Sequence, residues 1–463
     1  MLSLYMLLGG LAVASTEPAR TLSTWPNLTV EPETGTFVSM LNDTYPNVRQ
    51  FLRIPHAKPP VACPQYVSSG SSQWNMYAPA SLLVNLRENL NQGSVAWSSA
   101  EDCLSLAVWT PADVHRGSKL PVALFVTSGG GVTGGIYIPS QLPSPWVSRS
   151  QEHIVVTINY RVNIFRNPKS RAVNETSLSL LDVRAAVEWV HENIEAFGGN
   201  PENIMLWGQS QGAALTHLYT LAFPEDSRVA KFGVISQPPS VTIDLGTLAD
   251  VYQDFDIVAK ALGCNYGDDA EGELECMRQV SWVEIEEFIN QYSGSPSIFF
   301  SDTSVADEKY IFSTRLNNIF KKKVARGPAI RSDAAREMSS ENVSRVMEAE
   351  GEWDCTAATD SAMRRSLGLD TYRYLWGGNF SNISPVPWLG AYHWSDLLMI
   401  FGTYQDASGV IPQLEADASK SMQDHILAFM KNFSTVQETV GWPAFNPYGA
   451  DGGKILEFGK AHR

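Results

Sequence analysis

The chain has 463 residues, of which 44% are hydrophobic and 18% charged, so it is long enough to bury a large core. Its net charge of −15 argues against binding to nucleic acid or to an anionic membrane surface, because no basic block offsets the acidic excess. No repeat, low-complexity tract or long linker interrupts the sequence from Thr36 to Phe458, which predicts a single domain.

The first 14 residues have the features of a signal peptide. They are small and apolar, and Ala12 with Ala14 fits the small-x-small cleavage pattern, although no Lys or Arg precedes the apolar run. A run of roughly 12 apolar residues is too short to span a bilayer. We therefore expect residues 1–14 to be removed, residues 15–463 to form one domain, and the protein to be secreted without a stable membrane anchor.

Sequons and cysteines fit an exported protein. Chance would supply several Asn-x-Ser/Thr sequons, and the chain has seven: Asn27, Asn42, Asn174, Asn342, Asn379, Asn382 and Asn432. Among the five cysteines, Cys63 with Cys103 and Cys264 with Cys276 are close enough in sequence to pair. We expect two disulfides and one buried thiol, Cys355, and the alternative is five free buried thiols.

Short apolar runs predict strands of a sheet that is covered on both faces: Val122–Val126, His153–Asn159, Ile204–Trp207, Phe232–Ile235 and Tyr372–Trp376. Between them, the three- and four-residue spacing of apolar side chains predicts a helix over Leu181–Phe197, ended by Gly198-Gly199. This alternation indicates an α/β fold with a largely parallel sheet and helices on both faces.

The segment from Ile204 to Leu215 is the most informative. An apolar strand-like run breaks into Gly208-Gln-Ser-Gln-Gly212 and continues as a helix-like run, which is the context of a nucleophile elbow. The glycines leave room for a tight turn, so that Ser210 can project its hydroxyl above the edge of the sheet. We interpret Ser210 as a catalytic nucleophile.

A nucleophilic serine on this type of sheet is followed in the chain by an acid and then by a histidine base. Four histidines follow Ser210, but His217 falls in the helix after the elbow, His425 in another helical pattern, and His462 beside the last residue. His393 remains, in a loop after the strand that ends at Trp376. An imidazole, which ordinarily titrates near about 6.5, can accept the serine proton at neutral pH.

Three glycines follow the strand Val122–Val126. Glycines let backbone N–H groups approach a substrate oxygen without obstruction by side chains. The N–H groups of Gly130, Gly131 and Gln211 are therefore the expected oxyanion hole. The alternative interpretation, a flexible turn, does not explain the place of these glycines at a strand end ahead of the elbow.

Several motifs along most of the chain occur in one order: Phe51-Leu-Arg-Ile-Pro-His-Ala-Lys-Pro-Pro60, Glu101-Asp-Cys-Leu-Ser-Leu106, the three glycines, Asn159-Tyr-Arg161, Ala196-Phe-Gly-Gly-Asn-Pro201 and the elbow. In this the chain resembles the type-B carboxylesterases and lipases, relatives of the cholinesterases, and especially their secreted fungal members. The resemblance implies the α/β-hydrolase fold, a small-molecule ester substrate, Ser210 as nucleophile and His393 as base, with no metal or organic cofactor.

The resemblance also implies an acid and supports the disulfides. The family acid is a glutamate, and Glu337 occupies the corresponding stretch, although Asp333 or Glu341 could serve instead. The family pairs cysteines as expected here for Cys63–Cys103 and Cys264–Cys276. This sequence departs from the family at Ser128, Gln211 and Met338, where histidine, alanine and glycine are usual.

Three functions remain open from the sequence. The first is a secreted serine esterase that acts through an acyl-enzyme. The second is a triacylglycerol lipase of the same fold, for which the expected Cys63–Cys103 loop is the place to look for a lid. The third is a catalytically inactive, cholinesterase-like binding protein, although such proteins tend to lose triad residues.

Overall fold

The computed structural model describes residues 28–58, 100–174, 177–235, 252–294, 306–313, 323–334, 343–383, 390–407, 409–450 and 452–460, with Ile298, Ile319 and Lys321. Within residues 343–354 only the helical backbone is described. The expected signal peptide and Cys63 lie outside these ranges.

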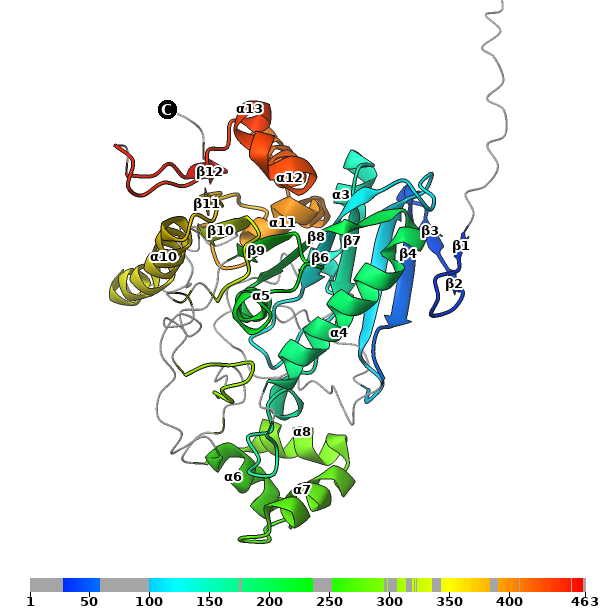
Figure 1. Ribbon diagram of the computed structural model, residues 1–463, viewed down its shortest axis with the longest axis vertical. Coiled ribbons are helices and arrows are strands. Elements are labelled where there is room, and N and C mark those ends of the chain that lie inside the picture. The colour runs from blue at the N-terminus through cyan, green and yellow to red at the C-terminus, as the bar shows by residue number, and fades with distance from the viewer. Residues whose placement is uncertain are drawn as a thin grey trace, which may run out of the picture.

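A large mixed sheet forms the centre of the molecule (Figure 1). In the described residues it has 10 strands in the order β12-β11-β10-β9-β8-β6-β7-β5-β4-β3, and a separate pair joins β1 to β2. Neighbours from β7 to β12 run parallel, whereas β3, β4 and β5 run antiparallel at one edge. The strands are β1 (Thr29–Val30), β2 (Phe37–Val38), β3 (Met40–Asn42), β4 (Tyr45–Pro55), β5 (Ser105–Pro111), β6 (Leu120–Val126), β7 (Ile154–Ile158), β8 (Gly199–Gln209), β9 (Lys231–Ile235), β10 (Ala329–Ala334), β11 (Thr371–Trp376) and β12 (Leu456–Phe458).

Helices cover both faces of this sheet (Figure 1). Among the described residues, none of them is long and apolar enough to cross a membrane. The helices are α3 (Ser144–Ser150), α4 (Leu178–Asn193), α5 (Gln211–Ala222), α6 (Gln253–Ala261), α7 (Ala270–Gln279), α8 (Trp282–Gln291), α10 (Val343–Ser366), α11 (Ser395–Phe401), α12 (Gln413–Asn432) and α13 (Val436–Val440).

Successive side chains of the central strands point alternately into two apolar cores, one on each face of the sheet. On β6, Leu124 belongs to the core beneath α4 and α5, whereas its neighbour Phe125 belongs to the core beneath α3, α11 and α12. Both side chains are 0% exposed. Successive side chains on a strand point to opposite faces, so a strand with both faces covered needs the continuous apolar run seen in the sequence.

The expected elements are present, with small shifts at their ends. The helix expected over Leu181–Phe197 is α4 followed by a 3₁₀ turn, η3 (Ile194–Phe197). Gly198 ends it in the left-handed conformation, with φ of 92°. The five expected strands correspond to β6, β7, β8, β9 and β11. The α/β-hydrolase fold class is therefore confirmed.

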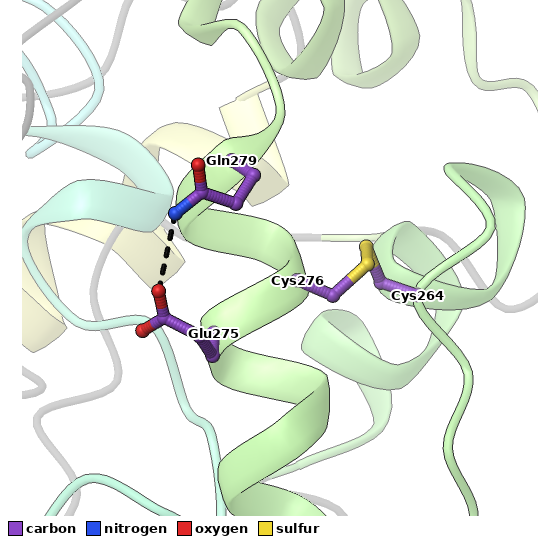
Figure 2. The surroundings of a disulfide bond; sticks show 4 residues. All are labelled: Cys264, Glu275, Cys276 and Gln279. Carbon is purple, nitrogen blue, oxygen red and sulfur yellow. Dashed lines mark hydrogen bonds between the residues drawn. A yellow bond between two sulfur atoms is a disulfide. The ribbon is translucent and has the colours of Figure 1, made fainter.

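Helices α6, α7 and α8 form a small unit at one end of the molecule, at the bottom of Figure 1. Their apolar core includes Phe255, Leu274 and Ile285, and it packs against Ile164 from the segment after β7. The expected disulfide Cys264–Cys276 joins the residues after α6 to α7 (Figure 2). The 12-residue separation corresponds to a stabilisation of about 3 kcal/mol in the chain-entropy model.

The other cysteines match the expectation in part. Cys103 is disulfide-bonded, and its expected partner, Cys63, lies outside the described residues. Cys355 is free, as expected, but the prediction that it is buried is wrong: its side chain is exposed on α10. The reason is that the side of a helix on which one residue falls depends on how the whole helix packs.

One sequon is part of the core. Asn382 is 3% exposed, and its Nδ2 donates to Oε1 of Glu415 on α12 at 3.0 Å. Because Nδ2 is the atom to which a glycan would be attached, Asn382 does not fit the expected glycosylation. Asn42, Asn174, Asn379 and Asn432 are exposed, whereas Asn27 and Asn342 lie outside the described residues.

Burial raises the pKa of Glu415 to about 7, which the hydrogen bond from Asn382 only partly offsets. A glutamate in the unfolded chain titrates near about 4.3, so between these values the folded state holds a proton that the unfolded state has lost. Stability from this group is therefore fully present below about pH 4.3 and is lost as pH rises through about 7.

We expect Glu415→Gln to flatten this pH dependence, by up to about 3 kcal/mol between pH 4 and pH 8, because the amide does not ionise. Urea unfolding of both proteins across this range measures the effect. Equal slopes of unfolding free energy against pH in the variant and the parent would contradict the assignment.

Candidate active site

The elbow turns sharply between β8 and α5. Ser210 joins them with φ of 53° and ψ of −121°, a backbone conformation that residues other than glycine rarely adopt. A Cβ on Gly208 would lie 2.4 Å from the Gly212 carbonyl oxygen, and one on Gly212 would lie 2.0 Å from the Val126 carbonyl oxygen. The two glycines thus permit the close approach of α5 to both β8 and β6.

The loop of residues 128–136, here called the glycine loop, lies beside this elbow. Strands β6 and β8 run parallel with Val126 opposite Gly208, so Ser128 and Ser210 each follow two residues later at the same edge of the sheet. Gly129, Gly130 and Gly131 have φ of 125°, 62° and 74°, all in the region that favours glycine. The structure therefore brings the expected oxyanion-hole segment next to the expected nucleophile.

The amide N–H groups expected to form the oxyanion hole are available. Outside helices and strands, no backbone hydrogen bond among the described residues uses the N–H of Gly130, Gly131 or Gln211. Gln211 is the first residue of α5, where the N–H group has no partner within the helix and the helix dipole favours a negative charge. These donors suit an oxygen that gains negative charge during a reaction.

Polar side chains hold the glycine loop in shape. Tyr160 donates from its hydroxyl to the Thr127 carbonyl at 2.9 Å, and Gln141 donates to Oγ of Ser128 at 3.1 Å. Asn159 accepts from the Ile136 N–H at 2.9 Å and donates to the Cys103 carbonyl at 3.0 Å. The motifs around Cys103 and Asn159-Tyr160 thus lie beside the glycine loop, although they are far apart in the sequence.

His393 lies between β11 and α11, in a loop fixed by its neighbours. Tyr392 is 0% exposed and donates from its hydroxyl to the Ile383 carbonyl at 2.8 Å. Ser395 accepts from Nε1 of Trp376 at 2.8 Å. The loop reaches across the sheet edge, so that Nε2 of His393 lies 3.0 Å from Nε2 of Gln209, the residue before Ser210.

Gln209 is a site residue that the sequence interpretation missed, although it directly precedes Ser210. Its side chain is 0% exposed. With the amide nitrogen facing the ring, Gln209 donates and Nε2 of His393 accepts. The ring proton is then on Nδ1, and the lone pair of Nε2 faces Gln209, so Nε2 can take a proton from a nucleophile once the Gln209 amide gives up this contact.

The other histidines after Ser210 are engaged elsewhere or not described. His217 is buried in α5, and its Nδ1 lies 3.8 Å from Oδ1 of Asp360 on α10. His425 lies in α12, where its Nδ1 is 2.6 Å from the Ser421 carbonyl. His462 lies outside the described residues.

Of the three candidate acids, the structure describes only Asp333. Glu337 and Glu341 lie outside the described residues. Asp333 is buried in β10 and forms an ion pair with Arg373 on β11, with 2.7 Å between Oδ2 and Nη2. Its carboxylate therefore already has a cationic partner within the sheet.

We expect Gly212→Ala to prevent formation of the elbow, because the added Cβ would overlap the Val126 carbonyl. The expected loss is at least about 3 kcal/mol of unfolding free energy, measured by urea denaturation, together with loss of any esterase activity. Gly263→Ala is the matched control: its φ is 82° and no atom lies within 4 Å of the added Cβ, so strain of about 1 kcal/mol is expected. Equal losses in the two variants would refute the close approach as the cause.

Comparisons with known proteins agree with this geometry. A family model described as the carboxylesterase family matches residues 34–340. The chain is 34% identical to a chlorogenic acid esterase of Aspergillus niger over 99% of this chain and 97% of that protein. It is 30% identical to secreted lipase 5 of Gibberella zeae, covering 90% and 88% of the two chains.

A further relative is described as inactive by its name. The inactive carboxylesterase-like protein VdtD of Byssochlamys spectabilis is 31% identical over 42% of this chain and 35% of its own length. The family match covers more than half of this sequence, and the two relatives named first align over nearly all of it. The chain thus belongs to the carboxylesterase family and is a carboxylic ester hydrolase.

Proposed function

We propose that the protein is a secreted serine esterase that hydrolyses small carboxylic esters through an acyl-enzyme. The observation that carries this proposal is the contact of His393 with Gln209, directly before Ser210, at a strained elbow beside a glycine loop. This contact supports the proposal because it places His393 beside the residue that precedes Ser210, 184 positions earlier in the chain than His393.

In the proposed reaction, Ser210 attacks the ester carbonyl while Nε2 of His393 takes the hydroxyl proton. The N–H groups of Gly130, Gly131 and Gln211 stabilise the negative oxygen of the tetrahedral intermediate. The same imidazole then protonates the leaving alcohol. Water, deprotonated by His393, then attacks the acyl-enzyme. The bond between the acyl carbon and Oγ of Ser210 breaks, the carboxylic acid leaves, and His393 returns the proton to Ser210.

Glu337 is the proposed acid that orients His393 through its Nδ1. Two observations support this choice over Asp333. Asp333 is already paired with Arg373. Glu337 follows the end of β10 by three residues, and β10 lies beside β11, the strand that leads to His393.

Relatives suggest where the protein acts and on what. Names of relatives include a chlorogenic acid esterase and a secreted lipase, which supports secretion, with residues 1–14 as signal peptide and residues 15–463 as one catalytic domain. We propose a soluble phenolic ester, with chlorogenic acid as the first compound to test, over a triacylglycerol. The identity and coverage of the chlorogenic acid esterase are both higher than those of the lipase.

A fluorophosphonate, which reacts with activated serines, tests the mechanism directly. We expect one adduct per protein, on the peptide that contains Ser210, found by intact and peptide mass spectrometry, and none with Ser210→Ala. Turnover of an aryl ester should fall at least about 10³-fold in that variant. Absence of an adduct on folded parent protein would favour the inactive binding protein instead.

If an adduct forms, initial rates on chlorogenic acid and on an emulsified triacylglycerol distinguish esterase from lipase.

Gln209→Glu should shift the activity to higher pH, because a carboxylate about 3 Å from the imidazole keeps His393 protonated over a wider range. We expect the acid limb of kcat/KM against pH to move upward by about one unit. Gln209→Leu is the control that removes the amide without adding charge, and its acid limb should not move upward. An unchanged acid limb in Gln209→Glu would exclude this contact from the working site.

A further inference from the structure

The carbonyl of Gly131 is held by a residue from the segment after β7. Asn163 donates its backbone N–H to this oxygen at 2.6 Å, which fixes the end of the glycine loop. Asn163 is 3% exposed and has φ of 56°. Asparagine tolerates this left-handed conformation better than most residues, so the residue type suits the turn as well as the contact.

The side chain of Asn163 contacts the unit formed by helices α6, α7 and α8, here called the helical unit. Its Nδ2 lies 3.0 Å from both Oε1 and Oε2 of Glu286, which is on α8 and is 5% exposed. A line of hydrogen bonds therefore runs from α8 through Asn163 to the glycine loop, joining residues 123 positions apart. A buried polar contact of this kind is costly to break, because the partner that remains is left unsatisfied.

The apolar core of helices α6, α7 and α8 lies beside this contact, and it contains both Ile164 and Ile285. Ile164 and Ile285, the chain neighbours of Asn163 and Glu286, both line a cavity of about 590 Å³ between the segment after β7 and helices α6 to α8. A space between two walls contributes no dispersion contacts across it. The hydrogen bonds of Asn163 are the polar link between α8 and the glycine loop beside this core and its cavity.

We propose that Glu286 and Asn163 are positioning residues that hold the glycine loop in the shape needed to bind the oxyanion, an inference that rests on the proposed function of that loop. Neither residue touches the reacting atoms. Burial raises the pKa of Glu286 to about 8, so its carboxyl group is neutral over the acidic and neutral range. A neutral acid can remain buried beside an amide without a cationic partner.

Two variants break the line at different points. Glu286→Leu removes the acceptor, and Asn163→Gly keeps the backbone turn while removing the side chain. We expect both to lower kcat for an aryl ester about 10- to 100-fold and to leave KM within about two-fold, because the oxyanion forms only in the transition state. Glu286→Gln retains an acceptor oxygen and should stay within about three-fold of the parent.

Glu273→Leu serves as the matched control. Glu273 is also a buried carboxylic acid of the helical unit, 4% exposed on α7, and kcat should not fall in this variant. Hydrogen–deuterium exchange of the peptide covering residues 128–135 gives a second readout that does not need turnover. We expect faster exchange in Glu286→Leu and Asn163→Gly than in the parent, and no change with Glu273→Leu.

Unchanged kcat and exchange in folded Glu286→Leu and Asn163→Gly would overturn the proposal, as would an equal loss in Glu273→Leu. If the parent hydrolyses no ester, the proposed function fails, and exchange alone then decides the positioning claim. Faster exchange in the two variants would still support the claim that Asn163 and Glu286 hold the glycine loop in place. Unchanged exchange would refute that claim.

Discussion

The close approach of α5 to the ends of β8 and β6 is the constraint on which the rest of the site depends. It exists because Gly208 and Gly212 have no Cβ, so that backbone meets backbone at distances that a side chain would prevent. The same approach holds Ser210 at a positive φ, points the start of α5 toward the sheet edge, and sets the glycine loop beside it. One packing contact therefore sets both the backbone of Ser210 and the place where α5 begins.

Loops at this edge lack the hydrogen bonds of a strand ladder, and polar side chains replace them. Asn159 ties the glycine loop to the Cys103 segment, and Tyr160 anchors the end of β6. Arg161 joins Asp182 of α4, with its backbone N–H at 2.9 Å and its Nη2 at 2.6 Å from the carboxylate. A buried backbone group needs a partner, so these side chains fix the shapes of loops that the sheet alone leaves open.

Buried acids in this molecule follow two patterns. Where an arginine is close, the acid is charged: burial alone would raise the pKa of Asp360, but Arg331 and its neighbours lower it to about 2. Where the partner is an asparagine, as for Glu286 and Glu415, burial dominates and the pKa rises to about 8 and about 7. The second pattern favours the folded state at acidic pH, since the folded protein then holds protons that the unfolded chain releases.

The sequence by itself determined the features that depend on neighbours in the chain. Apolar runs marked the central strands, the glycines marked the elbow and the end of the helix before it, and the short separation of Cys264 and Cys276 indicated their disulfide. Only the tertiary structure decided what meets across the sheet: Gln209 against His393, Asn163 against Glu286, the burial of Asn382 and the exposure of Cys355. Periodicity shows that a side chain lies on a buried face, but its partner there is set by how strands stack and helices pack, which local pattern does not encode.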